Sequence, residues 1–137
     1  MKTLFLVHIE ETFRNRFDDD MIDNIIKSAA LYDQVIHFTS MVNDEEPVEE
    51  LQPYITKEIQ WGWGYEPACF EYDKEELDYL IDSLGHEFTW IPPYLRNYNI
   101  REVDLGGGCD GECLTDMESV LSHLNIDYNR KMKFIYS

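Results

Sequence analysis

The sequence has little positive charge and few cysteines, and no apolar run in it is long enough to cross a membrane. Lys and Arg number 11 against 28 Asp and Glu, which gives a formal net charge of −17 over 137 residues. A surface of this sign repels nucleic acid and anionic membranes, so neither is expected as a partner. No apolar stretch approaches the length of a transmembrane helix.

The amino-terminal segment and the cysteine content both favour the cytoplasm. "MKTLFLVHIEET" turns acidic too early for a signal peptide. Three cysteines, an odd number, fit a reducing compartment and argue against a disulfide framework. Hydrophobic content of 44% and aromatic content of 14% exclude a disordered composition. We expect a single domain over residues 1–137.

The acidic residues are spread along the chain, in "DDD" at 18–20, "DEEP" at 44–47 and "EYDKEE" at 71–76. This dispersal favours solvated outer helix faces. The alternative is an acidic surface that recognises a basic protein partner.

Alternating apolar patterns predict a single α/β domain. Residues 3–9, 34–40, 100–105 and 132–137 have the composition of strands. Helical spacing is found between the first two strands and between the last two, at Ile22, Ile25, Ile26, Ala29, Leu114, Met117, Leu121 and Leu124. We expect a three-layer sandwich with a mostly parallel sheet.

The middle of the chain is less regular. Pro47 and Pro53 bracket a segment that can hold about two helical turns, and residues 61–67 are interpreted as a loop or edge segment. Asp73 with Glu76 resembles a capping box for a helix ending at Gly85. Residues 88–95 form a short strand at most, because Pro92 and Pro93 interrupt them.

The stretch "LGGGCDGECL" (residues 105–114) joins the third predicted strand to a helix. If Asp110 caps that helix, Cys113 lies in its first turn, where backbone N–H groups and the helix dipole favour a thiolate. Gly107, Gly108 and Gly111 would let the backbone approach a ligand closely. Carboxyl ends of parallel strands share one edge, so we expect His8 and Glu10 beside this loop. The alternative is a plain tight turn with the cysteines as small core residues.

Three stretches resemble the isochorismatase-like cysteine hydrolases, the superfamily that includes the nicotinamidases. "LFLVHIEETF" is similar to the opening strand of that family, and "DQVIHFTS" to its second strand. "NIREVDLGGGCDGECLTDMESVLSHLNI" is similar to the signature in which a strand enters a glycine and a nucleophilic cysteine opens a helix. The resemblance implies a Rossmann-like α/β fold, with Gly107 as that glycine and Cys113 as the nucleophile.

The sequence departs from the family pattern at the other catalytic positions. The family triad is aspartate, lysine and cysteine, and the position that matches the aspartate, counted back from Phe13, is His8. The lysine normally lies shortly before a segment that matches "GHEFTW", which offers His86 instead. The metal motif of nicotinamidases is absent from "TSMVNDEEP". The family's threonine–aspartate pair before the cysteine is replaced by Asp110 and Gly111.

Three functions stay open at this point. In the first, the chain is a degenerate relative that binds a small molecule or a protein partner without triad catalysis. In the second, Cys113 cleaves an amide-type C–N bond, with His8 as base, Glu10 or His86 orienting it, and N–H groups of residues 111–113 stabilising the oxyanion. Against this, Asp110, Glu112 and Asp116 flank the cysteine, and negative charge disfavours a thiolate. In the third, the chain is an acidic interaction protein.

The remaining motifs carry weaker signals. Cys109 and Cys113 alone cannot make a zinc site, so no metal is expected. The glycine triplet is not followed by Lys-Ser/Thr, so no cofactor is expected either. His37 is interpreted as a hydrogen-bonded sheet residue. Trp61 and Trp63 could line a ligand pocket or build a homo-oligomer, or they could plug the end of the core.

Overall fold

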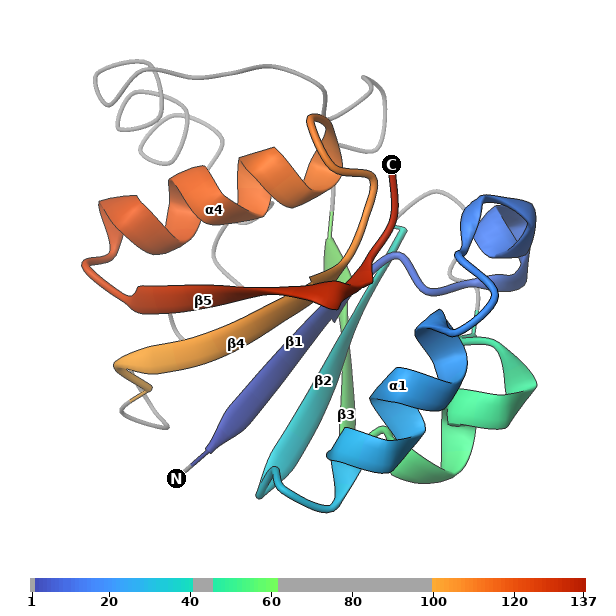
Figure 1. The fold of residues 1–137 in the computed structure, drawn as a ribbon. Helices are drawn as coiled ribbons and strands as arrows, with labels where there is room; N and C mark the ends of the chain where they lie inside the picture. The colour runs from blue at the N-terminus through green and yellow to red at the C-terminus, as the bar shows by residue number, and fades with distance from the viewer. Residues whose placement is uncertain (1, 41–45, 62–99) are drawn as a thin grey trace.

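The computed structural model describes residues 2–40, 46–61 and 100–137. These residues form a five-stranded sheet in the order β3-β2-β1-β4-β5, and every neighbouring pair is parallel (Figure 1). The strands are β1 (Thr3–Val7), β2 (Gln34–Ser40), β3 (Lys57–Trp61), β4 (Glu102–Gly107) and β5 (Asp127–Ile135). The predicted α/β class with a mostly parallel sheet is confirmed.

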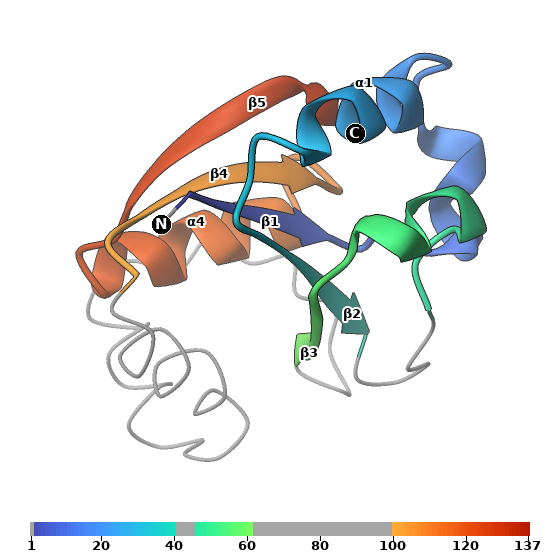
Figure 2. The ribbon, with the colours of Figure 1, turned by 90° about the horizontal axis from the view of Figure 1, so that it is seen from below.

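Helices cover both faces of the sheet. Helix α1 (Met21–Ala29) lies on one face and helix α4 (Cys113–His123) on the other (Figure 2). In β1, Phe5 and Val7 belong to the core layer under α4, whereas Leu4 and Leu6 belong to the layer under α1. Because this strand is buried on both faces, its sequence is a continuous apolar run. The arrangement has three layers, as predicted.

The 3-10 helices η1 (Glu11–Arg16) and η2 (Glu49–Tyr54) complete the described elements. Helix η2 is the short helical segment predicted between Pro47 and Pro53. Strand β2 matches its predicted bounds, while β1 ends two residues early because His8 has a positive φ of 51°.

Two strands differ from the sequence prediction. Strand β3 was not predicted, because Ile59 is its one buried residue with a described side chain. Strand β5 begins at Asp127 rather than at residue 132, since its first half carries polar and half-exposed side chains. The predicted helix over 73–85 and strand over 88–95 lie outside the described residues, as do Trp63 and His86.

No helix within residues 2–40, 46–61 and 100–137 has both the length and the apolar character of a membrane span.

The direction in which successive strands are added to the sheet reverses at β1, in its centre. From β1 the chain moves outward through β2 to β3, and β4 then pairs with the opposite side of β1. In open parallel sheets, ligands bind at the carboxyl ends of the strands where this reversal occurs. Between β1 and β4 that edge is formed by the residues after Val7 and after Gly107.

Candidate functional site

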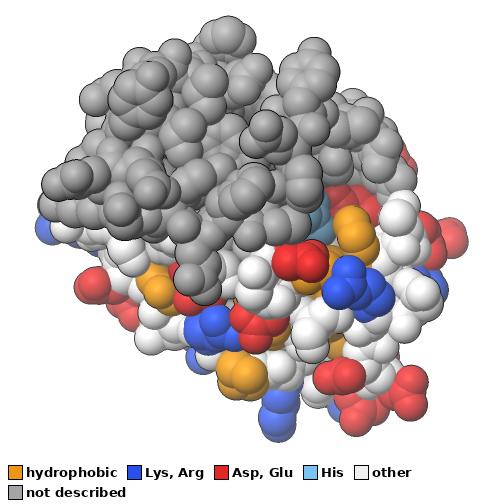
Figure 3. Space-filling model, turned by 90° about the horizontal axis from the view of Figure 1, so that it is seen from above, with side chains coloured by type: hydrophobic (Ala, Val, Ile, Leu, Met, Phe, Trp, Pro, Cys, Tyr) orange, Lys and Arg blue, Asp and Glu red, His pale blue; other side chains and the backbone are white. Residues whose placement is uncertain are grey.

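The carboxyl ends of β1 and β4 lie side by side. Val7 pairs with Gly107 in the sheet register, and the Gly108 N–H donates a hydrogen bond of 2.8 Å to the Val7 carbonyl. The segment after β1 therefore meets the glycine loop, as the sequence predicts. Figure 3 shows the molecule from above, and on the described part of this face acidic and basic side chains are interspersed among apolar and neutral ones.

His8 has an unusual backbone conformation at the end of β1. Its φ of 51° lies in the left-handed region, which costs a non-glycine residue about 1–2 kcal/mol. Two bonds hold it there: the His8 N–H donates to the Phe38 carbonyl at 2.9 Å, and the Tyr136 hydroxyl donates to the His8 carbonyl at 2.5 Å. Strained residues of this kind cluster at functional sites.

The His8 ring faces a buried carboxylate. His8 Nδ1 lies 3.1 Å from Glu10 Oε1, and the two residues are 5% and 1% exposed. Burial alone would raise the pKa of Glu10, but hydrogen bonding and Coulombic attraction to His37 and His8 lower it to about 2. Glu10 is therefore ionised at neutral pH. In the His8 tautomer whose Nδ1–H donates to Glu10, the lone pair that can act as a base is on Nε2.

His37 on β2 continues this series of polar contacts toward β3. Its Nδ1 lies 3.2 Å from Glu58 Oε1, and its Nε2 lies 3.7 Å from Glu10 Oε1. The interpretation of His37 as a hydrogen-bonded sheet residue is confirmed. Glu10 Oε1 thus lies 3.1 Å from His8 Nδ1 and 3.7 Å from His37 Nε2, so both imidazoles face the same carboxylate oxygen.

Gly107 and Gly108 are required by packing. Gly107 has a φ of +93°, and a Cβ there would stand 2.0 Å from the Val7 carbonyl oxygen. A Cβ on Gly108 would stand 2.8 Å from the Tyr136 ring. Gly111, with φ +83°, has no atom within 4 Å of its Cβ position. The expected approach of a ligand to these glycines stays a prediction, and only Gly111 has open space.

Helix α4 begins differently from the sequence prediction. Asp110 is not the N-cap; Glu112 occupies that position, and Cys113 is the first helical residue. The Asp110 carboxylate instead lies 2.7 Å from Arg130 Nη2 on β5. The Glu112 N–H donates to the Cys109 carbonyl at 3.0 Å, so it is engaged within the loop, and the expected oxyanion role of residues 111–113 stays a prediction.

Tyr136 connects the glycine loop to the His8 segment, because its carbonyl accepts from the Asp110 N–H at 2.9 Å and its hydroxyl donates to the His8 carbonyl. Neither Cys109 nor Cys113 forms a disulfide; Cys109 is buried and Cys113 is half-buried. Burial raises the pKa of Tyr136, and the nearby ionisable groups of Cys109, Glu10 and Cys113 raise it further. The phenol that donates to the His8 carbonyl therefore lies within electrostatic range of both thiols, while the Tyr136 side chain packs in the layer under α1 and Cys113 against the layer under α4.

Asp116 lies one helical turn after Cys113 and is 3% exposed. Neither of its carboxyl oxygens has a hydrogen-bond partner among the residues that the structure describes. Burial raises the pKa of Asp116 to about 8, so it is mostly neutral at pH 7. The Asp110 carboxylate shares Arg130 with Glu118, so one guanidinium faces two carboxylates, and the expected opposition of the flanking acids to a Cys113 thiolate stays a prediction.

The other predicted site residues are placed as follows. Trp61 is the last residue of β3, while Trp63 and His86 lie outside the described ranges. Among the described residues, no group of three or more His, Cys, Asp or Glu side chains could hold a metal ion.

No protein-family model matches this sequence, and a search of curated proteins finds no relative.

Sequence reasoning missed Tyr136 and the burial of Asp116. Tyr136 follows Phe134 at the two-residue spacing of a strand, and both side chains pack in the layer under α1. This spacing could have predicted that Tyr136 is buried on the same face as Phe134. Asp116 lies beside Met117 at the edge of the apolar stripe of α4, and no sequence signal distinguishes it from a solvated acid.

Proposed function

We propose that the protein binds a small molecule at the edge between β1 and β4, as an isochorismatase-like cysteine hydrolase in which His8 replaces the aspartate of the family. The observation that carries this proposal is the His8–Glu10 pair, 3.1 Å apart and buried, at the switch point of the sheet. A nucleophile, a base and a group that orients the base are the parts that covalent hydrolysis requires.

The order of elements supports the isochorismatase-like assignment. Strand β4 enters Gly107, a short loop follows, and Cys113 opens α4. Strand β5 then follows α4 and pairs with β4. This is the arrangement that the resemblance of the sequence implies for the nucleophile segment.

The reaction would proceed through a thioester. The Cys113 thiol transfers its proton to His8 Nε2, and the sulfur attacks the carbonyl carbon of an amide. The C–N bond breaks as the nitrogen takes the proton from His8, which leaves an acyl group on Cys113 and a free amine. Water, deprotonated by His8, then hydrolyses the thioester, and the proton returns to the thiol.

A second candidate function is binding without covalent chemistry. The N–H groups of Asp110 and Glu112 donate to the carbonyls of Tyr136 and Cys109 at 2.9 and 3.0 Å. These two donors are therefore engaged within the fold, and a developing oxyanion would have fewer partners than in a full cysteine hydrolase.

The esterase substrate p-nitrophenyl acetate tests the proposal. We expect wild-type protein to release p-nitrophenol with turnover, and Cys113→Ser to do so at least about 100-fold more slowly, because the hydroxyl is a far weaker nucleophile. The matched control is Cys109→Ser, which should keep most of the rate. Mass spectrometry should find the acetyl group on Cys113.

Two outcomes decide against hydrolysis at this site. Equal rates for wild type and Cys113→Ser would remove Cys113 as the nucleophile. Acetylation of Cys113 without turnover would favour the binding function.

A further inference from the structure

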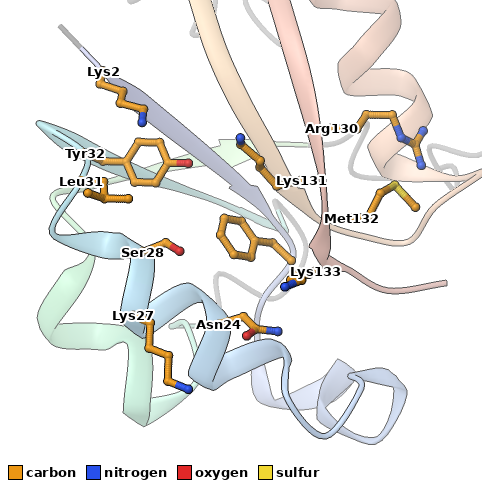
Figure 4. A pocket seen from close by; sticks show the side chains of 11 residues that line it. Lys2, Asn24, Lys27, Ser28, Leu31, Tyr32, Arg130, Lys131, Met132 and Lys133 are labelled. Carbon is orange, nitrogen blue, oxygen red and sulfur yellow. The ribbon is translucent and has the colours of Figure 1, made fainter.

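A pocket away from the His8 edge lies between α1 and β5 (Figure 4). It is open to solvent and has a volume of about 450 Å³, which falls within the roughly 300–1,000 Å³ of small-molecule sites. Lys2 and Tyr32, which help to line it, stand just before β1 and β2. This part of the pocket is therefore at the opposite ends of the strands from His8.

The charge of this pocket is opposite to that of the chain. Its lining holds five of the 11 Lys and Arg residues: Lys2, Lys27, Arg130, Lys131 and Lys133. None of its eleven lining residues is acidic, although the chain has 28 Asp and Glu in 137 residues. A random selection of surface from so acidic a sequence would include acids, so the basic lining calls for an anionic occupant.

Not all of these cations are available to a ligand. Arg130 is held by Glu118 and Asp110, each at 2.7 Å, and Lys131 Nζ lies 3.6 Å from Asp104 Oδ2. Lys27 and Lys133 are exposed and form no ion pair with any residue of the described ranges. Lys2 Nζ lies 5.2 Å from the centre of the Tyr32 ring, so it is held beside the pocket without neutralisation of its charge.

Two exposed apolar side chains also line the pocket. Leu31 is 64% exposed and Met132 is 66% exposed, and both line the pocket. The Ser28 hydroxyl and the Asn24 amide supply neutral hydrogen-bonding groups from α1. Lysine ammonium groups bind phosphate as point charges, and exposed Leu and Met side chains contact a flat apolar group.

We propose that this pocket binds a small phosphorylated compound with an apolar or aromatic part, such as a nucleoside diphosphate. Its phosphates are bound by lysines of the lining that form no ion pair with a described residue, and its apolar part contacts Leu31 or Met132, which lie on opposite sides of the pocket in Figure 4. The other six Lys and Arg are far outnumbered by the 28 acids, so a long polyanion that ran beyond the pocket would meet repulsive charge. The occupant is therefore small.

Calorimetric titrations of the full chain with pyrophosphate, ADP and adenosine, in about 50 mM NaCl to limit screening, test this proposal. We expect pyrophosphate and ADP to bind, and adenosine to bind at least about tenfold more weakly than ADP, since it lacks the phosphates. The double variant Lys27→Gln/Lys133→Gln should weaken pyrophosphate binding at least about tenfold, and Lys27→Arg/Lys133→Arg should largely retain it. Lys57→Gln, the same change on β3, is the matched control.

The role of Leu31 and Met132 is tested separately. Leu31→Ser/Met132→Ser should weaken ADP but leave pyrophosphate unchanged. Absence of binding by both anions at millimolar concentration would overturn the proposal, and so would equal affinity of the Lys27→Gln/Lys133→Gln variant and wild type. Self-association that this double variant abolishes would assign the pocket to the acidic surface of a second copy and overturn the small-ligand proposal.

Discussion

Replacing Gly107 by alanine is expected to destabilise the protein by about 4 kcal/mol, a large fraction of the roughly 5–15 kcal/mol by which folded domains are stable. The φ of +93° strains any side chain, and the new Cβ would stand 2.0 Å from the Val7 carbonyl oxygen and 2.5 Å from the Val7 nitrogen. These are backbone atoms of the neighbouring strand, so no rotamer change relieves the overlap. The β1–β4 pair must separate at the candidate site.

Gly111→Ala is the matched control for this effect. Its φ of +83° is similar, but no atom lies within 4 Å of the new Cβ, so we expect only the cost of the backbone conformation, about 1–2 kcal/mol. Urea unfolding of both variants measures the two losses. Equal losses would mean that the Gly107 contact with β1 is not required.

Replacing Asp116 by asparagine is expected to stabilise the protein, with a gain that increases with pH. Burial raises the pKa of Asp116 to about 8 from the ordinary value of 3.8. Between these values the unfolded chain is ionised and the folded protein is not, so folding binds a proton and stability falls as pH rises. The Asp116→Asn variant has no such proton to bind.

The stability difference between Asp116→Asn and wild type should grow by roughly 1 kcal/mol per pH unit between about pH 5 and 8. Urea unfolding at several pH values measures it. Asp127→Asn, an exposed acid at the start of β5, controls for the general effect of removing one negative charge. A difference that does not change with pH would contradict the buried, neutral state of Asp116.

The class of fold could be predicted because its central strands are buried on both faces. Residues 3–7 lie in the interior of a parallel sheet, and burial of both faces imposes the continuous apolar run that is visible in the sequence. Strands β3 and β5 are the outermost described strands. Much of their side-chain surface is exposed, so their polar residues obscured the strand pattern.

The juxtaposition of His8 with the glycine loop was predictable for the same reason, because parallel strands end at one edge. The groups that tune the site were not predictable. Arg130 reaches Asp110 and Glu118 from β5, and Tyr136 reaches the His8 carbonyl across 128 positions of sequence. Contacts between residues so far apart in the sequence depend on the three-dimensional packing. The spacing of residues within a segment cannot predict them.

The proposed partnership of His8 and Cys113 is tested most directly by the rate of iodoacetamide alkylation of Cys113, measured by peptide mass spectrometry across a range of pH. In wild-type protein we expect Cys113 to react faster at pH 7 than the buried Cys109, with a pH midpoint below that of an ordinary thiol, because only the thiolate is nucleophilic. His8→Ala should slow alkylation of Cys113 about tenfold at this pH and leave Cys109 unchanged. Identical Cys113 rates in wild type and His8→Ala would show that the imidazole does not act on the thiol, and would contradict the proposed site.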